Sequence, residues 1–505
     1  MAKIYTIAPL GLKGVLVEVE SNLSRHLPKI IIVGLPDIAV QEAKERVWAA
    51  IENSGFDFPR QKVVVNLAPA QIRKEGGAYD LPIAISILQA SGYFCFQSEK
   101  TAFIGELSLS GKLKPVPGAL VMAGSLKELG FKEIFLPQGN AKETSILEGL
   151  DIFPVDTLGQ VVSHLQGKEK IIPAKKISFL AKEPKNQVDF FDICGQEQAK
   201  RVLEIAASGG HNVLMVGPPG AGKTMLAKAF LSILPPPTMA EALAVSKIHS
   251  LAGYLSEEKH LVDSRIVRSP HHSASTMAIV GGGAWPRPGE ISLAHHNVLF
   301  LDEILEFPRQ VLEALRQPLE DKKITVSRAI GSLDFPANFI LLATANPCPC
   351  GYLTDKSKEC QCRPIEIERY QKRLSGPLLD RIDLHFLVPR VKSESYQEEL
   401  NCRENSTQVK TRVFLARKRQ EERFFGQEFF LNADMEAKAI RKYCLLPTTA
   451  KEILRQASDT LGLSARAYYQ IIKVARTIAD LAGQEKIAKE HILEALQYRS
   501  KIFNH

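Results

Sequence analysis

The sequence lacks long apolar runs. No stretch approaches the ~20 apolar residues that a membrane-spanning helix needs, and the opening MAKIYTIAPLGLKG has no continuous apolar core of the kind found in signal peptides. It also has no internal repeat and no extended low-complexity tract. These absences argue against membrane, secreted and repeat proteins, and we expect a cytoplasmic globular protein without membrane contact.

Cysteine is scarce, with 8 among 505 residues, and half of them lie in one segment, NPCPCGYLTDKSKECQC. Cys348 and Cys350 are followed after nine residues by Cys360 and Cys362. In a reducing compartment, clustered cysteines more often bind metal or do redox chemistry than form disulfides. Four thiolates can hold one tetrahedral Zn²⁺ in a closed structural site, so we expect zinc. Redox-active thiols and an iron–sulfur cluster are the alternatives.

The chain is too long for one hydrophobic core, so roughly two to four domains are expected. Residues 1–165 mix strand-like and helical patterns, which indicates an α/β domain, and the lysine-rich residues 166–190 are typical of a linker. Residues 191–390 alternate short apolar strands with helices, as in a parallel sheet covered on both faces, and contain the cysteine loop 346–362. Residues 391–505 are expected to be helical.

The C-terminal region is basic. Residues 401–505 carry 19 Lys and Arg against 12 Asp and Glu. Such a balance suggests a polyanionic partner, although a solvated helical surface explains it as well.

The segment HNVLMVGPPGAGKTMLAKAF has the form strand, glycine-rich turn, helix, and it matches the phosphate-loop pattern GxxxxGK[ST]. In such a loop, backbone N–H groups surround the phosphates of ATP. Lys223 is expected to reach the β and γ phosphates, and Thr224 to bind Mg²⁺. A chance match in an ordinary turn is the alternative, which the flanking strand and helix disfavour. The predicted nucleotide-binding residues are Gly217, Pro218, Pro219, Gly220, Ala221, Gly222, Lys223 and Thr224.

Two further apolar strands end in polar residues. NVLFLDEI delivers Asp302 and Glu303 to the edge of a sheet, where ligands bind in open α/β folds. Asp302 is expected to hold Mg²⁺ through water, and Glu303 to orient and deprotonate the attacking water. NFILLATAN ends at Asn346, which could sense the γ phosphate. Solvated acids and a strand-terminating turn are the alternative explanations.

Several motifs together resemble the magnesium-chelatase-like AAA+ proteins of the ComM/YifB type, and this resemblance covers nearly the whole chain. It implies a ring, expected to be a hexamer, with ATP at the subunit interfaces. It also makes Arg381 an arginine finger for a neighbour's γ phosphate and Arg466 a second sensor arginine; the spacing of these arginines alone indicates neither role. His296 and Asn297 depart from the usual Asn-Gly, outside the nucleotide contacts. The motifs are DICGQEQAKRVLEIAASGGHNVLMVGPPGAGKTMLA, SPHHSASTMAIVGGG, PRPGEISLAH, VLFLDEI, ATANPCPCGY, LSGPLLDRIDLH and LSARAYYQIIKVARTIADL.

The first domain resembles the protease domain of Lon through IGELSLSGKLKPVPGAL and EGGAYDLPIAISIL. That protease uses a Ser nucleophile activated by a Lys. By our alignment these positions are Asp80 and Val121, so we expect a Lon-like scaffold that performs no proteolysis.

The segment KKITVSRA alternates apolar and polar residues, as a β-hairpin arm does. In this branch of AAA+ proteins such hairpins point into the central pore. There Lys322, Lys323 and Arg328 would meet a DNA phosphate backbone without sequence preference. An exposed charged hairpin is an equally good interpretation.

The resemblance implies an ATP-driven hexameric motor that migrates or unwinds branched and single-stranded DNA. Members of the ComM type act on recombination intermediates during natural transformation. The rival functions are a magnesium-chelatase-type protein remodeller and a scaffold that binds ATP as a switch without turnover. An intact Glu303 and Arg381 favour turnover.

Overall fold

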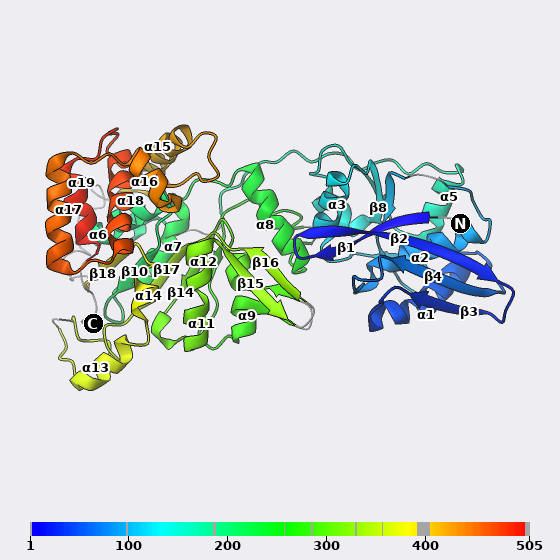
Figure 1. Cartoon of the computed structure of the whole chain (residues 1–505), viewed down its shortest axis with the longest axis horizontal. Helices are drawn as coiled ribbons and strands as arrows, with labels where there is room; N and C mark the ends of the chain where they lie inside the picture. Colours follow the sequence, from blue (N-terminus) through cyan, green and yellow to red (C-terminus); the bar gives the residue numbers. More distant parts are fainter. Residues whose placement is uncertain are drawn as a thin grey trace. The chain divides into compact units, whose positions relative to one another are not determined.

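A computed structural model of the chain contains two compact units (Figure 1). One unit comprises Met1–Leu180 and Met239–Asp263, and the other comprises Ala181–Thr238 and Ser264–His505. Within the described part of the chain, no helix has the length and apolarity to cross a membrane. The described residues are 3–96, 99–184, 188–256, 258–283, 286–328, 331–355, 357–390 and 404–499.

The first unit is built on a seven-stranded mixed sheet with the order β3-β4-β2-β1-β5-β8-β9. The long antiparallel pair β1 and β2 lies at its centre, and the strands from β5 to β9 pair in parallel. The strands are β1 (Lys3–Leu10), β2 (Lys13–Ser24), β3 (Lys29–Val33), β4 (Lys62–Ala68), β5 (Thr101–Phe103), β8 (Glu133–Pro137) and β9 (Asp151–Val155), with a separate ribbon of β6 (Glu106–Leu107) and β7 (Leu113–Lys114).

Both faces of this sheet are buried, because alternate residues of a strand point to opposite faces. Ile4 and Ala8 of β1 enter one apolar cluster, whereas Tyr5 and Ile7 join another. Helices α1, α2 and α5 cover the first face, and α3 and α4 the second. The helices are α1 (Ile38–Asn53), α2 (Asp80–Ala90), α3 (Ala119–Glu128), α4 (Gln138–Thr144) and α5 (Leu158–Leu165), with a 3-10 turn, η1 (Gly77–Tyr79).

Helix α8 (Met239–Leu251) lies in the segment Met239–Asp263, which belongs to the first unit although the chain before and after this segment belongs to the second. The backbone N–H of Gly118 donates to the carbonyl of Ser250 at 2.9 Å, and the N–H of Leu120 donates to the Ser250 hydroxyl at 3.3 Å. Leu243 packs against the cluster under α3. The boundaries expected from the sequence do not assign this segment to the first unit.

The positions that our alignment pairs with the catalytic Ser and Lys of Lon hold neither of these side chains. Asp80 is buried at the start of α2, where it accepts from Arg46 Nε at 2.8 Å and from the Leu107 N–H at 3.1 Å. Burial raises the pKa of Asp80 to about 6, and the neighbouring Arg46 opposes this rise. Val121 is buried in α3. Asp80 therefore works as one half of a structural ion pair.

Replacing Arg46 by Ala should destabilise the first unit by about 3 kcal/mol at pH 8, because Asp80 would keep a buried charge without its partner. The loss should shrink at pH 5, where the Asp80 carboxyl is protonated. Hydrogen exchange of α1 and α2 in the full-length protein would measure it. Glu45→Ala, an exposed change on the same helix, is the control. Equal protection in both variants would contradict this role of the pair.

The second unit contains a five-stranded parallel sheet with the order β11-β14-β17-β10-β18. Helices α6 (Glu197–Gly209) and α7 (Lys223–Ile233) share its main apolar cluster. The parallel sheet and the helical C-terminal region confirm the predicted α/β fold class. The strands are β10 (Val213–Val216), β11 (Val267–Arg268), β14 (Val298–Leu301), β17 (Ile340–Ala345) and β18 (Leu384–Leu387).

In the described residues 404–499, five helices follow the sheet and pack on it through α6 and α7 (Figure 1). Tight packing of α18 on α6 and of α15 on α6 and α7 makes the C-terminal helices and the sheet one continuous core. The helices are α15 (Ser406–Arg423), α16 (Ala437–Tyr443), α17 (Thr448–Leu461), α18 (Ala465–Leu481) and α19 (Lys489–Gln497).

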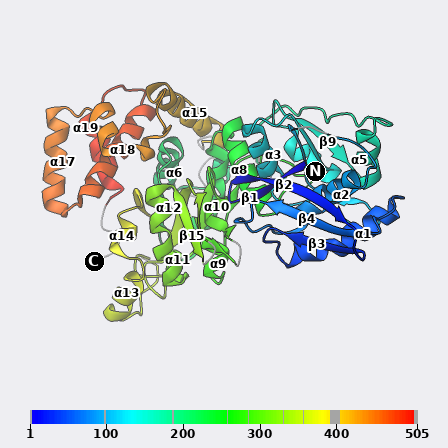
Figure 2. The same ribbon diagram turned by 45° about the vertical axis from the view of Figure 1, so that its right-hand side comes forward.

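The expected β-hairpin forms from β15 (Lys323–Arg328) and β16 (Gly331–Pro336), and it lies beside α12 (Figure 2). The remaining described elements between the strands of the sheet are α9 (Thr276–Val280), β12 (Gly281–Gly282), β13 (Arg287–Pro288), α10 (Glu290–Leu293), α11 (Arg309–Ala314), α12 (Arg316–Asp321), α13 (Pro364–Gln371) and α14 (Gly376–Leu379), with a 3-10 turn at Ile304–Glu306. Two further 3-10 turns lie before and after the sheet, at Phe190–Asp192 and Asn432–Asp434.

Candidate functional site

The glycine-rich loop joins β10 to α7 at the carboxyl edge of the parallel sheet. Gly220 and Gly222 have φ angles of +78° and +85°, a left-handed region that glycine enters at little cost. A Cβ atom on Gly217 would lie 2.3 Å from the carbonyl oxygen of Val388, so no side chain fits there. The loop has the backbone conformation and space of a phosphate-binding loop.

Lys223 is the buried first residue of α7. Its Nζ donates to the carbonyl of Gly217, to that of Pro218 at 3.1 Å, and to Asn346 Oδ1 at 3.0 Å. Asn346 reaches this position because β17 is parallel to β10, with Ala345 in register with Val216. The structure therefore brings these two predicted site residues into direct contact.

Burial lowers the pKa of Lys223 to about 8, and the neighbouring carboxylates of Asp302 and Glu303 oppose this shift. A bound polyphosphate would favour the charged ammonium further. The protonation of Lys223 is therefore coupled to whatever anion the loop binds.

Asp302 and Glu303 directly follow β14 at the same edge. Asp302 accepts from the Thr224 hydroxyl at 3.0 Å, and the Glu303 N–H donates to Thr344 Oγ1 at 2.9 Å. Thr344 also donates to Asp302 Oδ1 at 2.5 Å. Glu303 has a φ of +53°, which is uncommon for a residue with a side chain and is typical of strained functional sites.

Sequence reasoning missed Thr344, which is fully buried in β17 and holds both the Asp302 carboxylate and the backbone of Glu303. The available signal was a lone hydroxyl within the apolar run FILLATA. Buried polar side chains are usually hydrogen bonded, so a threonine in a buried strand predicts a nearby hydrogen-bond partner.

The two predicted arginines lie elsewhere. Arg381 precedes β18, whose Leu384 is in register with Val213 at the start of β10. The carbonyl of Arg381 accepts from Asn212 Nδ2 at 3.5 Å, at the amino edge of the sheet. The four residues of β10 span ~13 Å, so the strand separates Arg381 from its own phosphate loop. Arg466 of α18 lies near Arg381, because both bind Glu320.

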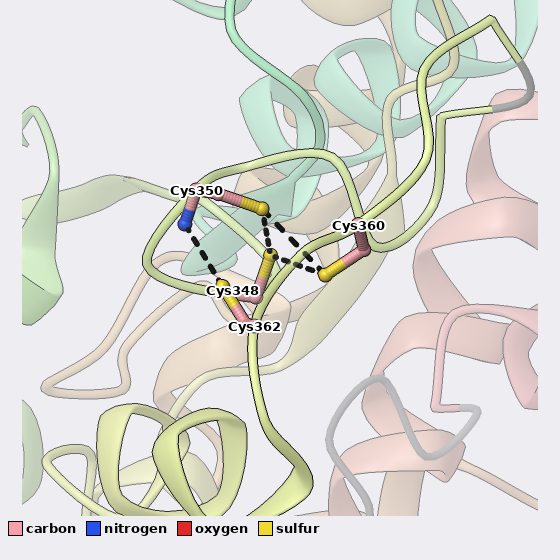
Figure 3. Close-up of side chains that lie close together, drawn as sticks. All are labelled: Cys348, Cys350, Cys360 and Cys362. Atoms are coloured by element: carbon pink, nitrogen blue, oxygen red, sulfur yellow. Dashed lines mark hydrogen bonds between the residues drawn. The ribbon is translucent and has the colours of Figure 1, made fainter.

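The four clustered cysteines converge on one point (Figure 3). Their Sγ atoms all lie within 4.8 Å of one another. The Sγ of Cys348 is 3.4 Å from that of Cys350 and 3.7 Å from that of Cys360. The Sγ atoms of Cys350 and Cys360 are 3.6 Å apart. Four sulfurs bound tetrahedrally at ~2.3 Å would be ~3.8 Å apart. The cluster therefore has the chemistry and the size of a zinc site.

The cysteine loop lies directly on the phosphate loop. Gly351 has a φ of +84°, and a Cβ atom there would be 2.7 Å from Cδ of Pro219. The Gln371 amide of α13 donates to the carbonyl of Pro347 at 2.9 Å, which holds the beginning of the loop. Any group that orders the cysteines therefore also orders the segment that begins at Asn346.

The lysines predicted to contact DNA make ion pairs at the base of the hairpin. Lys322 lies 3.3 Å from Asp434, and Lys323 lies 2.7 Å from Asp334 of the opposite strand. The side chain of Arg328 lies outside the described residues. As predicted DNA contacts, Lys322 and Lys323 would have to exchange these partners for phosphates.

The sheet order, the phosphate loop and the two strand-end carboxylates define a P-loop ATPase core of the AAA+ class. Three family models match the chain. Subunit ChlI of Mg-chelatase matches residues 19–140, Magnesium chelatase, subunit ChlI matches residues 189–396, and its C-terminal model matches residues 403–499. The chain belongs to the magnesium-chelatase-like AAA+ family of the ComM/YifB type.

Full-length relatives support this assignment. The chain is 43% identical over 508 residues to Competence protein ComM of Haemophilus influenzae, covering 99% of this chain and 98% of that protein. It is 42% identical over 501 residues to YifB of Salmonella typhimurium, covering 99% and 97%. The N-terminal region is similar to Lon protease 2 of Bacillus subtilis, 30% identical over 148 residues, which are 28% of this chain and 26% of that protein.

The family implies ATP and Mg²⁺ as ligands, and the site fits both. The loop offers backbone N–H groups and a lysine to phosphates, and the Thr224 hydroxyl and the Asp302 carboxylate offer the oxygen ligands that Mg²⁺ prefers. The predicted family is thereby confirmed, whereas the predicted roles of single residues stay predictions.

The coupling of Lys223 to a bound anion predicts proton uptake with ATP. At pH 8.5 about 0.8 proton should be taken up per ATP bound, and at pH 7 about 0.1, because the free lysine titrates near pH 8. The affinity for ATP should accordingly fall as the pH rises above 8. Titration calorimetry in two buffers of different ionisation enthalpy measures the uptake. Lys228→Ala, an exposed change on the same helix, should keep it; equal uptake at both pH values would contradict the coupling.

Proposed function

We propose that this protein is an ATP-driven hexameric motor that migrates or unwinds branched DNA during the integration of DNA in natural transformation. The observation that supports the proposal is that the residues predicted for the ATP site lie at two opposite edges of the sheet. One edge offers the phosphate loop with Asp302 and Glu303, and the other offers Arg381 and Arg466. Two copies placed edge to edge would complete one site.

Each residue of the proposed site has a specific role. Lys223 and the loop N–H groups bind the β and γ phosphates, while Asn346 holds Lys223 in place. Thr224 and Asp302 would hold Mg²⁺, which would neutralise phosphate charge. Glu303 orients and deprotonates the attacking water, and Arg381 and Arg466 of the next subunit stabilise the charge on the γ phosphate.

DNA as the substrate has two supports. A relative of nearly the same length is named a competence protein, and the C-terminal region is basic, with 19 Lys and Arg against 12 Asp and Glu in residues 401–505. The hairpin β15–β16 is the proposed strand contact. A magnesium-chelatase-type remodeller of proteins is the second candidate, favoured by the three chelatase models that match the chain.

The proposed motor predicts ATP-dependent separation of a labelled three-way or four-way DNA junction. The Glu303→Gln variant should bind ATP and lose at least about a hundredfold in rate, because no base activates the water. A gel assay follows the strands, with Glu421→Gln, an exposed change on α15, as the matched control. Intact junctions together with continued ATP hydrolysis would favour the protein remodeller instead.

We propose further that Cys348, Cys350, Cys360 and Cys362 hold one structural Zn²⁺. The support is the mutual distance of their sulfurs and the contact of their loop with Pro219. A closed four-thiolate site would stabilise the long connection between Asn346 and Arg381.

Protein purified without chelator should contain about one equivalent of zinc, because four thiolates form a closed site. Atomic emission measures the metal. Cys360→Ser should lose it, whereas Cys95→Ser, a change at an exposed cysteine of the first unit, should keep it. Less than about a tenth of an equivalent of zinc would contradict the site, and iron in its place would indicate a cluster.

A further inference from the structure

The carboxylate of Glu320 binds two arginines at once. Arg381 Nε donates to Glu320 Oε2 at 3.1 Å, and a second nitrogen of the same guanidinium also contacts that oxygen. Arg466 donates to the other oxygen, Oε1. The two carboxylate oxygens of Glu320 therefore bind different arginines.

The three residues come from separate parts of the second unit. Glu320 lies near the end of α12, Arg381 follows α14, and Arg466 lies in the first turn of α18. Arg381 is fixed further by a bond from its guanidinium to the carbonyl of Pro377 at 2.7 Å, and its side chain is 12% exposed, against 38% for Arg466. Through its two oxygens, Glu320 thus determines the position of Arg466 relative to Arg381.

The Glu320 carboxylate allows the guanidinium groups of Arg381 and Arg466 to lie close together. Two guanidinium groups close together repel each other, and a carboxylate between them turns the repulsion into two attractions. The bond from Arg381 lowers the pKa of Glu320, so the carboxylate stays charged at neutral pH. Without it the two side chains would separate, because each is long and flexible.

We propose that Glu320 is a positioning residue that holds Arg381 and Arg466 side by side, so that the pair meets the phosphates of an ATP bound to a neighbouring copy of this chain. The inference rests on the proposed hydrolysis at a subunit interface. Arg381 is separated from its own phosphate loop by the length of β10, so the partner phosphate belongs to another copy. The pair lines a cavity of about 860 Å³ that also includes Lys322 and Lys473.

A purely structural role makes a different prediction. Glu320 could simply join α18 to α12, since it connects the C-terminal helices to the sheet domain. In that case its loss would change stability or assembly, and its effect would add to that of losing Arg381. If Glu320 acts through the two arginines, its loss has no further effect once both Arg381 and Arg466 are absent.

The test compares ATP hydrolysis by the full-length protein and its Glu320→Gln variant. The substitution should lower kcat about tenfold, or about 1.4 kcal/mol, and leave KM for ATP within about twofold, because each subunit binds ATP through its own loop. Glu320→Asp should restore part of the rate. Asp321→Asn, the neutralised neighbour on the same helix, is the matched control, and the oligomeric state with ATP is measured for each variant.

The decisive comparison is the double variant Arg381→Ala, Arg466→Ala with and without Glu320→Gln. Equal rates in these two proteins support the positioning role, whereas a further tenfold loss in the triple variant overturns it. An unchanged kcat in Glu320→Gln also overturns it and leaves the proposed ATPase intact. If the unmodified protein hydrolyses no ATP, the proposed function and this inference both fail.

Discussion

The parallel pairing of β10 with its two neighbours is the constraint on which the site depends. Because β14, β17 and β18 all run in the same direction as β10, the residues directly after these strands lie at one edge of the sheet and those directly before them lie at the other. Lys223, Asp302 and Asn346 therefore meet, while Arg381 is carried away from them. No local preference of these residues would achieve this arrangement without the sheet.

In the proposed function, this division leaves a single chain with an incomplete site. The phosphate-loop edge carries the residues proposed to hold ATP and to activate water, whereas the arginines proposed to meet the γ phosphate lie about one strand length away. The proposed arrangement would make turnover depend on contact between copies. It would also let one subunit respond to the nucleotide on the next, because Glu320 lies only two residues before Lys322 and the hairpin.

Much of this arrangement follows from local sequence patterns. The phosphate loop, the carboxylates after β14 and the hairpin each have a short signature, since each depends on neighbouring residues. Thr344 and Glu320 have no such local signature, because their partners are distant in sequence. The sheet and the C-terminal helices bring these partners to them. The same limit applies to α8, whose packing on the first unit depends on tertiary contacts of Ser250 and Leu243.

The connection between β17 and β18 links both halves of the proposed mechanism. It begins at Asn346, which contacts Lys223 of the same copy, and it ends at Arg381, whose proposed ligand lies on another copy. Between them the four cysteines draw the chain together over Pro219. A loop of this length would lose much conformational entropy on ordering, and a metal clip would supply that order in advance. We therefore interpret the cysteine cluster as a structural support for this connection. It would fix the positions of Asn346, proposed to sense the nucleotide of its own copy, and of Arg381, proposed to contact the nucleotide of the next copy.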